Sequence, residues 1–414
     1  MRQRSQKLGL WLVGACGNVA ATVAVGLAAL VKRRTPPVGL WTERPECAAL
    51  PLVPLAGITL GGHDLRGRRV TDTVRRLRER SGLFNEAMLR AARPAVAAYQ
   101  RAIRPGTAVG CGRTVARLAG GGAEPAGRTG RAIIDALRRD LYNFRRRNRL
   151  DRVVVINVAS TEPIFKHSTA HADWVRLAAA LKRSRHPPLP ASSLYAIAAI
   201  EESMPYVNFT PSLGADVPAI RELADARGVP IMGRDGKTGE TLVKSVLAPM
   251  FRDRALDVLS WTGHNILGNL DGHVLADPGH KAAKLRTKGN VIRSIVGGDV
   301  ATHVSIEYVA SLHDWKIAWD HVHFRGFLGT PMSLQFTWQG ADSILAAPLV
   351  LDLARLADFH AAAGGTGVMA HLACFFKSPM DVAARDFPTQ VEMLRRYVAA
   401  HTPARSRRAP EARR

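Results

Sequence analysis

Hydrophobic residues in the first half of the chain form short continuous runs that alternate with longer helical segments. Residues 9–13 (GLWLV) and 152–160 (RVVVINVAS) are such runs, and they predict strands buried on both faces of a sheet. Residues 18–31 and 130–147 have the length and composition of helices. Because the alternation continues through YVNFTPS and VPIMG, the pattern predicts a doubly wound parallel sheet.

The pattern changes in two further regions. Residues 68–104 have helical spacing, and the Gly/Pro-rich residues 105–130 predict a loop. After residue 242, a helix precedes the Gly/Asn-rich run GHNILGNLDG and a Lys-rich helix. Alternating segments such as HVSIEYV and MSLQFTW then predict an antiparallel sheet. Beyond residue 346 the chain is predicted to be helical again, with a disordered tail after about residue 402.

Composition adds a strongly basic character to this picture. The 414 residues are enough for two domains, and the formal net charge is +24. Arginine clusters at 145–149 and 405–414 lack the interleaved aromatic residues of an RNA-binding surface, so a solvated basic surface is favoured over specific nucleic-acid binding. A substrate that carries phosphate also fits the sign of the charge.

The cysteines and the hydrophobic N-terminal stretch bear on the compartment. The four cysteines have no metal-ligand spacing, which favours free thiols in a reducing cytoplasm. Residues 8–31 resemble a signal peptide or membrane anchor, but Gly14, Gly17 and Asn18 interrupt them where a strand would turn into a helix. We therefore expect a cytoplasmic protein without a membrane segment.

The first glycine turn, from Gly14 to Ala20, is close to the dinucleotide-binding pattern G-x-G-x-x-G/A. Cys16 stands where the second glycine is expected. Small residues let the backbone approach a pyrophosphate, and the helix start supplies N–H donors. Glycine turns of this kind are common, so the motif alone is weak. Asp64, in TLGGHDL, is a candidate either for binding a ribose hydroxyl or for capping a turn.

Several lysines and one loop are candidates for chemistry. Lys284 and Lys288 are four residues apart, so on a helix they share a face and lower each other's pKa, although a solvated helix face gives the same spacing. Lys316 and Lys377 have apolar neighbours and are either solvent-seeking side chains or desolvated acids or bases. The loop RDGKTGET is either an anion-binding helix start or a capped loop without a ligand. His313, His321 and His323 lack further ligands at diagnostic spacing, so no metal site is expected.

Taken together, ordered stretches of the chain resemble the inositol-3-phosphate synthase family from about residue 9 to residue 380. The stretches are VGACGNVAAT, TLGGHDL, VVVINVASTEP, YVNFTPS, GRDGKTGETLVKSVLAPMF, SWTGHNILGNLDG, KAAKLRTKGNVI, HDWKIAWD, ADSILAAPLVLDL and FFKSP. The resemblance implies an α/β fold, in which an NAD-binding Rossmann-type doubly wound sheet carries an inserted α+β catalytic and oligomerisation domain. The implied boundaries are 1–241 for the NAD-binding domain, 242–345 for the insertion, 346–401 for helices that complete the first domain, and 402–414 for a basic tail.

The resemblance also implies the activity. Glucose 6-phosphate would be oxidised at C5 with NAD+ as acceptor, enolised, closed by an intramolecular aldol reaction and reduced again. The product is a myo-inositol phosphate, and the enzyme is formally an isomerase. A tightly bound NAD that is regenerated in each cycle and a homotetramer are implied, while a divalent or monovalent cation stays open.

The family's functional positions fall on particular residues of this chain. The implied catalytic residues are Lys284, Lys288, Lys316, Lys377, Asp235 and Asp342. The implied substrate-binding residues are Thr238, Gly239, Asn269 and Asp271, with Lys288 also helping to hold the phosphate. The cofactor side is implied to contain Gly14, Gly17, Asn18, Asp64, Ser160 and Asn208.

Two departures from the family pattern bear on the substrate. Glu240 stands where well-known members have Gln beside the phosphate, and an ionised carboxylate there is expected to repel a dianion. Leu270 replaces an Asn of the substrate loop. The alternatives are a related synthase acting on another sugar phosphate, for example by five-membered ring closure of fructose 6-phosphate, and an NAD-dependent sugar-phosphate dehydrogenase. A non-catalytic basic binding protein ranks last.

Overall fold

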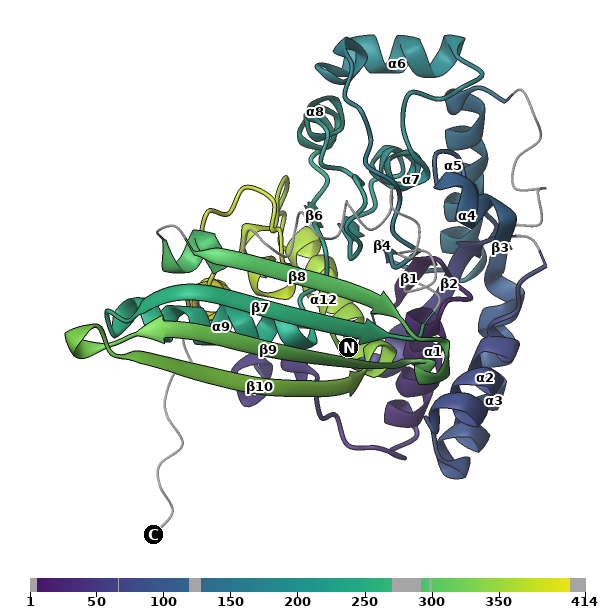
Figure 1. Ribbon diagram of the computed structural model, residues 1–414. Coiled ribbons are helices and arrows are strands. Elements are labelled where there is room, and N and C mark those ends of the chain that lie inside the picture. Colours follow the sequence, from purple (N-terminus) through teal and green to yellow (C-terminus); the bar gives the residue numbers. More distant parts are fainter. Residues whose placement is uncertain (1–5, 66, 119–127, 270–291, 298–299, 403–414) are drawn as a thin grey trace.

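The computed structural model describes residues 6–65, 67–118, 128–269, 292–297 and 300–402 (Figure 1). Its first sheet has six parallel strands in the order β3-β2-β1-β4-β5-β6. The strands are β1 Leu8–Val13, β2 Ile58–Asp64, β3 Ile103–Pro105, β4 Arg152–Asn157, β5 Tyr206–Asn208 and β6 Ile231–Gly233. The predicted doubly wound sheet is therefore confirmed, and its carboxyl ends lie along one edge.

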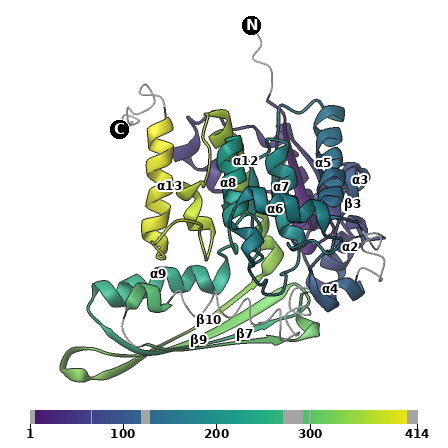
Figure 2. The same ribbon diagram turned by 90° about the horizontal axis from the view of Figure 1, so that it is seen from above.

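Helices cover this sheet in two packed groups. The first group contains α1 Asn18–Val31, α2 Val70–Ser81, α3 Glu86–Ala102 and α12 Asp342–Ala362, and α1 contacts the other three. The second group contains α5 Gly130–Arg147, α6 Trp174–Arg183, α7 Ala191–Glu201 and α8 Pro218–Arg227. Short helix α4 Gly112–Leu118 and C-terminal helix α13 Phe387–His401 lie at the edges of the layers (Figure 2).

The hydrophobic N-terminal stretch is explained by burial inside the protein. β1 is the third of six strands and is buried along its whole length, and α1 is buried against α3 and α12. A strand and a helix that are covered on all sides need no polar face, so their composition mimics that of a membrane segment. Within the described ranges, no helix combines the length and hydrophobicity needed to cross a membrane.

The helical pattern of residues 68–104 contains two helices rather than one. α2 ends at Gly82, which adopts a left-handed conformation with φ +69°. α3 then begins after Asn85, whose side chain accepts a hydrogen bond from the Met88 amide. A glycine that ends one helix and an asparagine that caps the next explain the break within a continuous periodic pattern.

The second sheet contains β7 Asp257–Leu267, β8 Ala301–Tyr308, β9 Trp315–Arg325 and β10 Pro331–Ala341, in the order β10-β9-β7-β8. The predicted antiparallel arrangement holds for the pairs β10–β9 and β9–β7 but is wrong for β7 and β8, which are parallel. Alternating polarity shows which face of a strand is buried, but it carries no information on the direction of the neighbouring strand.

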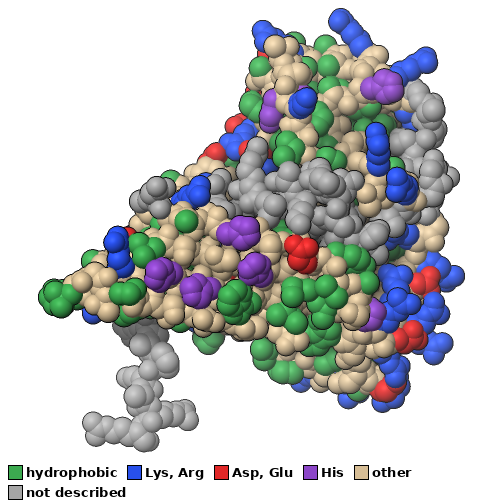
Figure 3. Space-filling model, in the orientation of Figure 1, with side chains coloured by type: hydrophobic (Ala, Val, Ile, Leu, Met, Phe, Trp, Pro, Cys, Tyr) green, Lys and Arg blue, Asp and Glu red, His purple; other side chains and the backbone are tan. Residues whose placement is uncertain are grey.

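Helix α9 Gly239–Asp253 packs on one face of the second sheet (Figure 2). Phe251 of this helix joins Trp261 and Val322 in a small separate core. Because side chains alternate along a strand, the opposite face carries His264, Trp319 and their neighbours. Figure 3 shows several histidines gathered on this exposed face.

Candidate functional site

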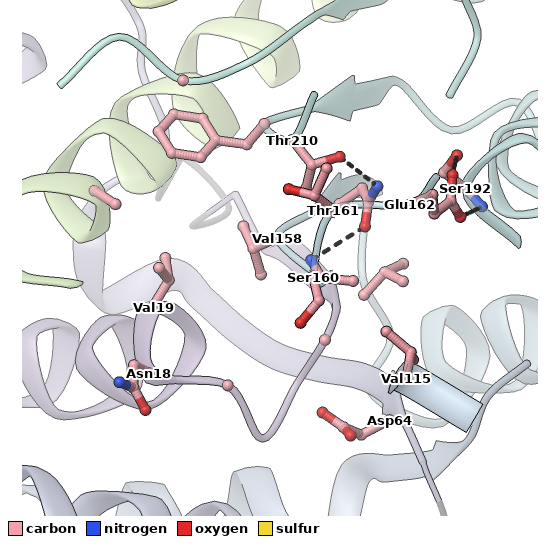
Figure 4. A pocket seen from close by; sticks show the side chains of 18 of the residues that line it. Asn18, Val19, Asp64, Val115, Val158, Ser160, Thr161, Glu162, Ser192 and Thr210 are labelled. Atoms are coloured by element: carbon pink, nitrogen blue, oxygen red, sulfur yellow. Dashed lines mark hydrogen bonds between the residues drawn. The ribbon is translucent and has the colours of Figure 1, made fainter. Parts of the chain in front are cut away.

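A cavity of about 270 Å³ lies where the carboxyl ends of β1, β2 and β4 meet residues of the second sheet. The glycine turn, Asp64 and Ser160 line one side, as Figure 4 shows for part of this wall. Asn269, Lys316 and other residues next to the second sheet line the other side. In open α/β sheets, ligands bind at this edge because the loops diverge there.

The glycine turn is shaped by close backbone contacts. Gly14 has φ +89°, and a Cβ there would lie 2.8 Å from the Cα of Ala159. The Gly14 amide donates to the His63 carbonyl at 2.9 Å, which ties the turn to the end of β2. Cys16, in place of the second glycine, is only 2% exposed, and its pKa is raised to about 12 by burial and then by Asp64. The thiol therefore stays neutral.

This turn fits the pyrophosphate of a dinucleotide. The turn brings bare backbone to the cavity wall at Gly14 and Gly17, and α1 begins there with Asn18. Among the described residues, no side chain caps the first turn of α1, so its N–H groups are available at the cavity edge. The predicted cofactor residues Gly14, Gly17, Asn18, Asp64 and Ser160 all line the cavity.

Asp64 acts as an anchor of the turn. Its Oδ2 accepts from the Cys16 amide at 2.6 Å, and its Oδ1 accepts from the Leu65 amide at 2.7 Å. Of the two predicted roles, the turn-capping one is therefore confirmed, while the residue also borders the cavity. Burial raises its pKa, against the effect of the two amides.

Asn208 is buried at the end of β5. It is 2% exposed and is not among the described residues that line the cavity. Its Nδ2 donates to the Ser212 carbonyl at 2.7 Å, and its Oδ1 accepts from Asn157 at 3.1 Å. Its side-chain amide holds the loop that follows β5, and a role on the cofactor side stays a prediction. That loop does reach the cavity, through Phe209 and Thr210.

Two of the predicted catalytic residues form a buried ion pair. Lys377 Nζ donates to Asp235 Oδ1 at 2.7 Å, and both side chains are less than a tenth exposed. Backbone hydrogen bonds reinforce the contact, since the Lys377 amide donates to the Asp235 carbonyl at 2.7 Å. Asp235 itself has a left-handed backbone with φ +62°. The pair lines the cavity together with Lys316.

Asp342 and Asn269 are also brought together. Asn269 Nδ2 donates to Asp342 Oδ2 at 2.9 Å, which joins the end of β7 to the start of α12. Both residues line the cavity. Lys284, Lys288 and Asp271, as well as Leu270, lie outside the described residues.

The loop before α9 divides into two parts. Thr238 lines the cavity, whereas Gly239, with φ +52°, is buried beside Trp338 and is not among the described lining residues. Lys237 turns away from the cavity and donates to Gln390, and burial lowers its pKa to about 8.

Glu240 has a different setting from the one expected. Its side chain is fully buried and lies 2.5 Å from Lys244 Nζ. Lys244 also pairs with Asp320 at 2.9 Å, and Asp320 accepts from the Trp261 indole at 2.8 Å. Glu240 is not among the described residues that line the cavity. The carboxylate therefore faces Lys244 inside the protein and has no described contact with the cavity, so a direct contact with a phosphate dianion is not supported.

Two carboxylates at the cavity were not singled out from the sequence. Asp314 is 1% exposed, accepts from Asn18 Nδ2 at 2.8 Å, and has a pKa raised to about 6 by burial. It joins β9 to the glycine turn. Glu162 accepts from the Ser192 amide at 2.7 Å, and burial raises its pKa to about 7. Asp314 lies in the stretch HDWK and Glu162 in the stretch STEP. Buried loops usually contain apolar or neutral residues, so an acidic residue at these positions was the signal that could have pointed to them.

The described ranges contain no group of three or more His, Cys, Asp or Glu side chains that could hold a metal ion. His321 and His323 lie on β9, and His313 lies just before it. The cavity instead brings together Lys316, the Lys377–Asp235 ion pair and a glycine turn that fits a dinucleotide.

Comparisons with known proteins agree with this arrangement. A family profile described as myo-inositol-1-phosphate synthase, of the NAD-binding type, matches residues 42–398. Inositol-3-phosphate synthase 1 of Bacteroides thetaiotaomicron is 36% identical over 410 residues, covering 93% of this chain and 91% of that protein. The inositol-3-phosphate synthase of Trypanosoma brucei brucei is 28% identical over 397 residues, covering 86% and 73% respectively.

Solved structures share the fold. The inositol-3-phosphate synthase of Caenorhabditis elegans matches with a TM-score of 0.85 at 22% identity, over 96% of this chain and 86% of that one. A myo-inositol-1-phosphate synthase-related protein from Thermotoga maritima MSB8 matches with a TM-score of 0.77 at 24% identity, over 95% and 99%. The resemblance identified from the motifs is confirmed: this chain belongs to the NAD-binding myo-inositol-1-phosphate synthase family of enzymes.

Proposed function

We propose that this protein is an NAD-dependent inositol-3-phosphate synthase, an isomerase that converts glucose 6-phosphate to a myo-inositol phosphate. The observation that supports this most strongly is the buried Lys377–Asp235 pair, which shares one cavity with Lys316 and with the glycine turn. NAD bound along the turn supplies a hydride acceptor and donor for C5 of the sugar. Substrate and product are isomers, so the reaction causes no net oxidation or reduction of the sugar or of NAD.

The lysines supply positive charge where the reaction develops negative charge. An enolate and an alkoxide form in succession during enolisation and aldol closure, and fixed cations in a site with little water stabilise both. Lys377, oriented by Asp235, is proposed to act at the C5 oxygen and to move its proton. Lys316 is proposed to stabilise the enolate oxygen. Lys284 and Lys288 keep the catalytic roles that the family pattern gives them.

Binding of the phosphate is proposed at the start of α9. Thr238 lines the cavity at this point, and the first amides of the helix favour an anion. Gly239 permits the left-handed backbone that starts the helix. Asn269 and Asp342, which share a hydrogen bond, are proposed to hold sugar hydroxyls together with Asp271. A requirement for a divalent or monovalent cation remains part of the proposal.

Three further features belong to the same proposal. We assign residues 1–241 and 346–401 to the NAD-binding domain, 242–345 to the inserted domain and 402–414 to a basic tail. The exposed face of the second sheet is proposed to form the interface of a homotetramer. We propose no specific nucleic-acid or membrane partner for the protein. A cytoplasmic location is supported by four free thiols at Cys16, Cys47, Cys111 and Cys374.

The decisive experiment incubates the purified protein with NAD+ and glucose 6-phosphate and follows the products by phosphorus NMR. The expected result is an inositol phosphate signal without net accumulation of NADH. Net NADH absorbance during turnover would show a sugar-phosphate dehydrogenase instead. Conversion of fructose 6-phosphate, but not of glucose 6-phosphate, would show the alternative cyclitol-phosphate synthase.

A further inference from the structure

Two arginines extend the cofactor side of the cavity beyond the residues expected from the family pattern. Arg68 follows the end of β2, and Arg76 lies in α2; both line the cavity together with Asp64. Figure 3 shows Lys and Arg side chains gathered over the region of α2 and α3. In sheets of this type, the residues after β2 lie at the ribose of the adenosine half of a dinucleotide.

Arg76 is linked to the glycine turn through Thr73. Arg76 Nη2 donates to Thr73 Oγ1 at 2.9 Å, and Thr73 Oγ1 donates to the Cys16 carbonyl at 2.7 Å. The positive charge of Arg68 also acts on Cys16 and Asp64, where it opposes the rise in pKa that burial causes in both groups. The two arginines and Asp64 therefore line the part of the cavity next to the glycine turn.

The charges at this point do not balance within the described part of the chain. No carboxylate in that part lies within ion-pair distance of Arg68 or Arg76, whereas Arg75 of the same helix pairs with Asp72 at 3.1 Å. The pKa of Arg76 is lowered first by burial and then by the charge of Arg68. Two arginines on one wall of the cavity, without a carboxylate partner in the described residues, favour an anion bound beside them.

Asp64 already has a structural role in the turn. Each of its oxygens already accepts a backbone N–H, at 2.6 and 2.7 Å. In enzymes selective for NAD, an acidic residue at this place accepts from the 2′-hydroxyl of the ribose. In enzymes that bind NADP, a nearby Arg accommodates the 2′-phosphate instead. Here the acid anchors the turn, and Arg68 and Arg76 line the same cavity.

We propose that Arg68 and Arg76 form an anion subsite for the 2′-phosphate of an adenine dinucleotide, so that this chain binds NADP as well as NAD. The proposal rests on the proposed function for the use of a dinucleotide, and it adds a determinant of cofactor choice. Planar guanidinium groups bind phosphate with two parallel hydrogen bonds, which makes the preference sensitive to the position of the phosphate.

The test measures binding by isothermal titration calorimetry on the full chain, without relying on turnover. The probes are adenosine 5′-monophosphate, adenosine 2′,5′-bisphosphate and its 3′,5′ isomer, followed by NAD+ and NADP+. The 2′,5′ compound is expected to bind at least about tenfold more tightly than the monophosphate and than the 3′,5′ isomer. The combined change Arg68→Ala and Arg76→Ala is expected to abolish this difference.

Arg75→Ala is the matched control, because this arginine lies on the same helix but pairs with Asp72 and is not among the described lining residues. This variant should leave the ratio of the affinities for the 2′,5′ and 3′,5′ bisphosphates unchanged. Equal binding of the two bisphosphates would show attraction by net charge alone and would overturn the proposal, as would an unchanged ratio in the double variant. If NAD+ also fails to bind, the proposed cofactor itself is wrong; if NAD+ binds and NADP+ does not, this inference alone fails.

Discussion

The two sides of the cavity hold their polar side chains in different ways. On the side of the parallel sheet, Asp64 and Glu162 have their oxygens occupied by backbone amides and a serine hydroxyl. On the side of the C-terminal segment, the buried carboxylate of Asp235 faces the ammonium group of Lys377. The first arrangement fixes the shape of a turn, whereas the second places charge in a site with low dielectric constant.

This difference matches the needs of the two ligands. A dinucleotide must be held in one place, and backbone donors on a rigid turn achieve this without titrating. A sugar that passes through charged intermediates needs groups whose charge is already present when the intermediate forms. Variants on the two sides are therefore expected to separate binding of the cofactor from catalysis.

The largest effect is expected for Lys377→Met. Loss of the ammonium should lower kcat for cyclisation by about a thousandfold, because one fixed charge or proton-transfer group contributes on the order of 10²–10⁴. The affinity for NAD+, measured by calorimetry, should stay within about twofold. Steady-state rates from phosphorus NMR give the first quantity.

A loss of folding is the competing explanation for Lys377→Met, because the change leaves Asp235 buried without its cation. The double variant Asp235→Asn with Lys377→Met removes both charges and should recover most of the stability but none of the activity. Recovery of activity in the double variant would exclude Lys377 as a catalytic residue.

On the cofactor side, Gly14→Ala is expected to lower the affinity for NAD+ by about tenfold or more. The new Cβ would stand 2.8 Å from the Ala159 backbone, and φ +89° disfavours any L side chain by roughly 1–3 kcal/mol. The turn must therefore shift away from the position that the pyrophosphate needs. Calorimetric titration with NAD+ measures the loss.

Gly26→Ala is the matched control for Gly14→Ala. Gly26 lies within α1, and a Cβ there meets nothing within 4 Å. The change should leave NAD+ affinity unaltered and stabilise the protein by up to about 1 kcal/mol, because alanine favours a helix more than glycine does. Equal behaviour of the two variants would contradict the role given to Gly14.

The elements on the cofactor side were also the more predictable ones. Residues 18–31 and 130–147 coincide with α1 and α5, and the run 9–13 differs from β1 by one residue. Continuous burial leaves a strong local signal in such segments. Gly14 and Gly17 were found for the same reason, since the turn is contained in seven consecutive residues.

The pairings on the other side depend on contacts between distant residues. Lys377 and Asp235 are 142 positions apart, and Asn18 reaches Asp314 across 296 positions. No local pattern encodes such partners, so the sequence located Lys377 and Asp235 only through the family resemblance. The burial of Glu240 against Lys244 is local, at four residues on a helix, and was missed because the pair reads as an ordinary surface pair.

A smaller effect is expected from Glu162, as a dependence of stability on pH. Burial raises its pKa from 4.5 to about 7, so the folded state holds this proton more readily than the unfolded state does. The stabilisation is present in full below about pH 4.5 and is lost as the pH rises towards 7. Glu162→Gln removes this dependence, on the order of 3 kcal/mol across that range.

Urea unfolding of both proteins between these pH values measures the Glu162 effect as a difference. Asp314 and Asp352 also have pKa values raised to about 6, and they titrate in both proteins alike, so the comparison cancels their contribution. Parallel curves for the wild type and Glu162→Gln would show that the folded protein does not retain the proton on Glu162.

The smallest effect is expected for Glu240→Gln, at the position where this chain departs from the family pattern. The carboxylate is fully buried and faces Lys244, which keeps Asp320 as a partner at 2.9 Å. The substitution leaves one cation and one anion, so the free energy of unfolding should change by less than about 1 kcal/mol. Because the side chain is apart from the cavity, KM for glucose 6-phosphate should stay within about threefold, whereas Thr238→Ala at the cavity wall should raise it more. A large fall in KM for Glu240→Gln would contradict this expectation. It would show that the Glu240 carboxylate repels the substrate phosphate even though it faces Lys244.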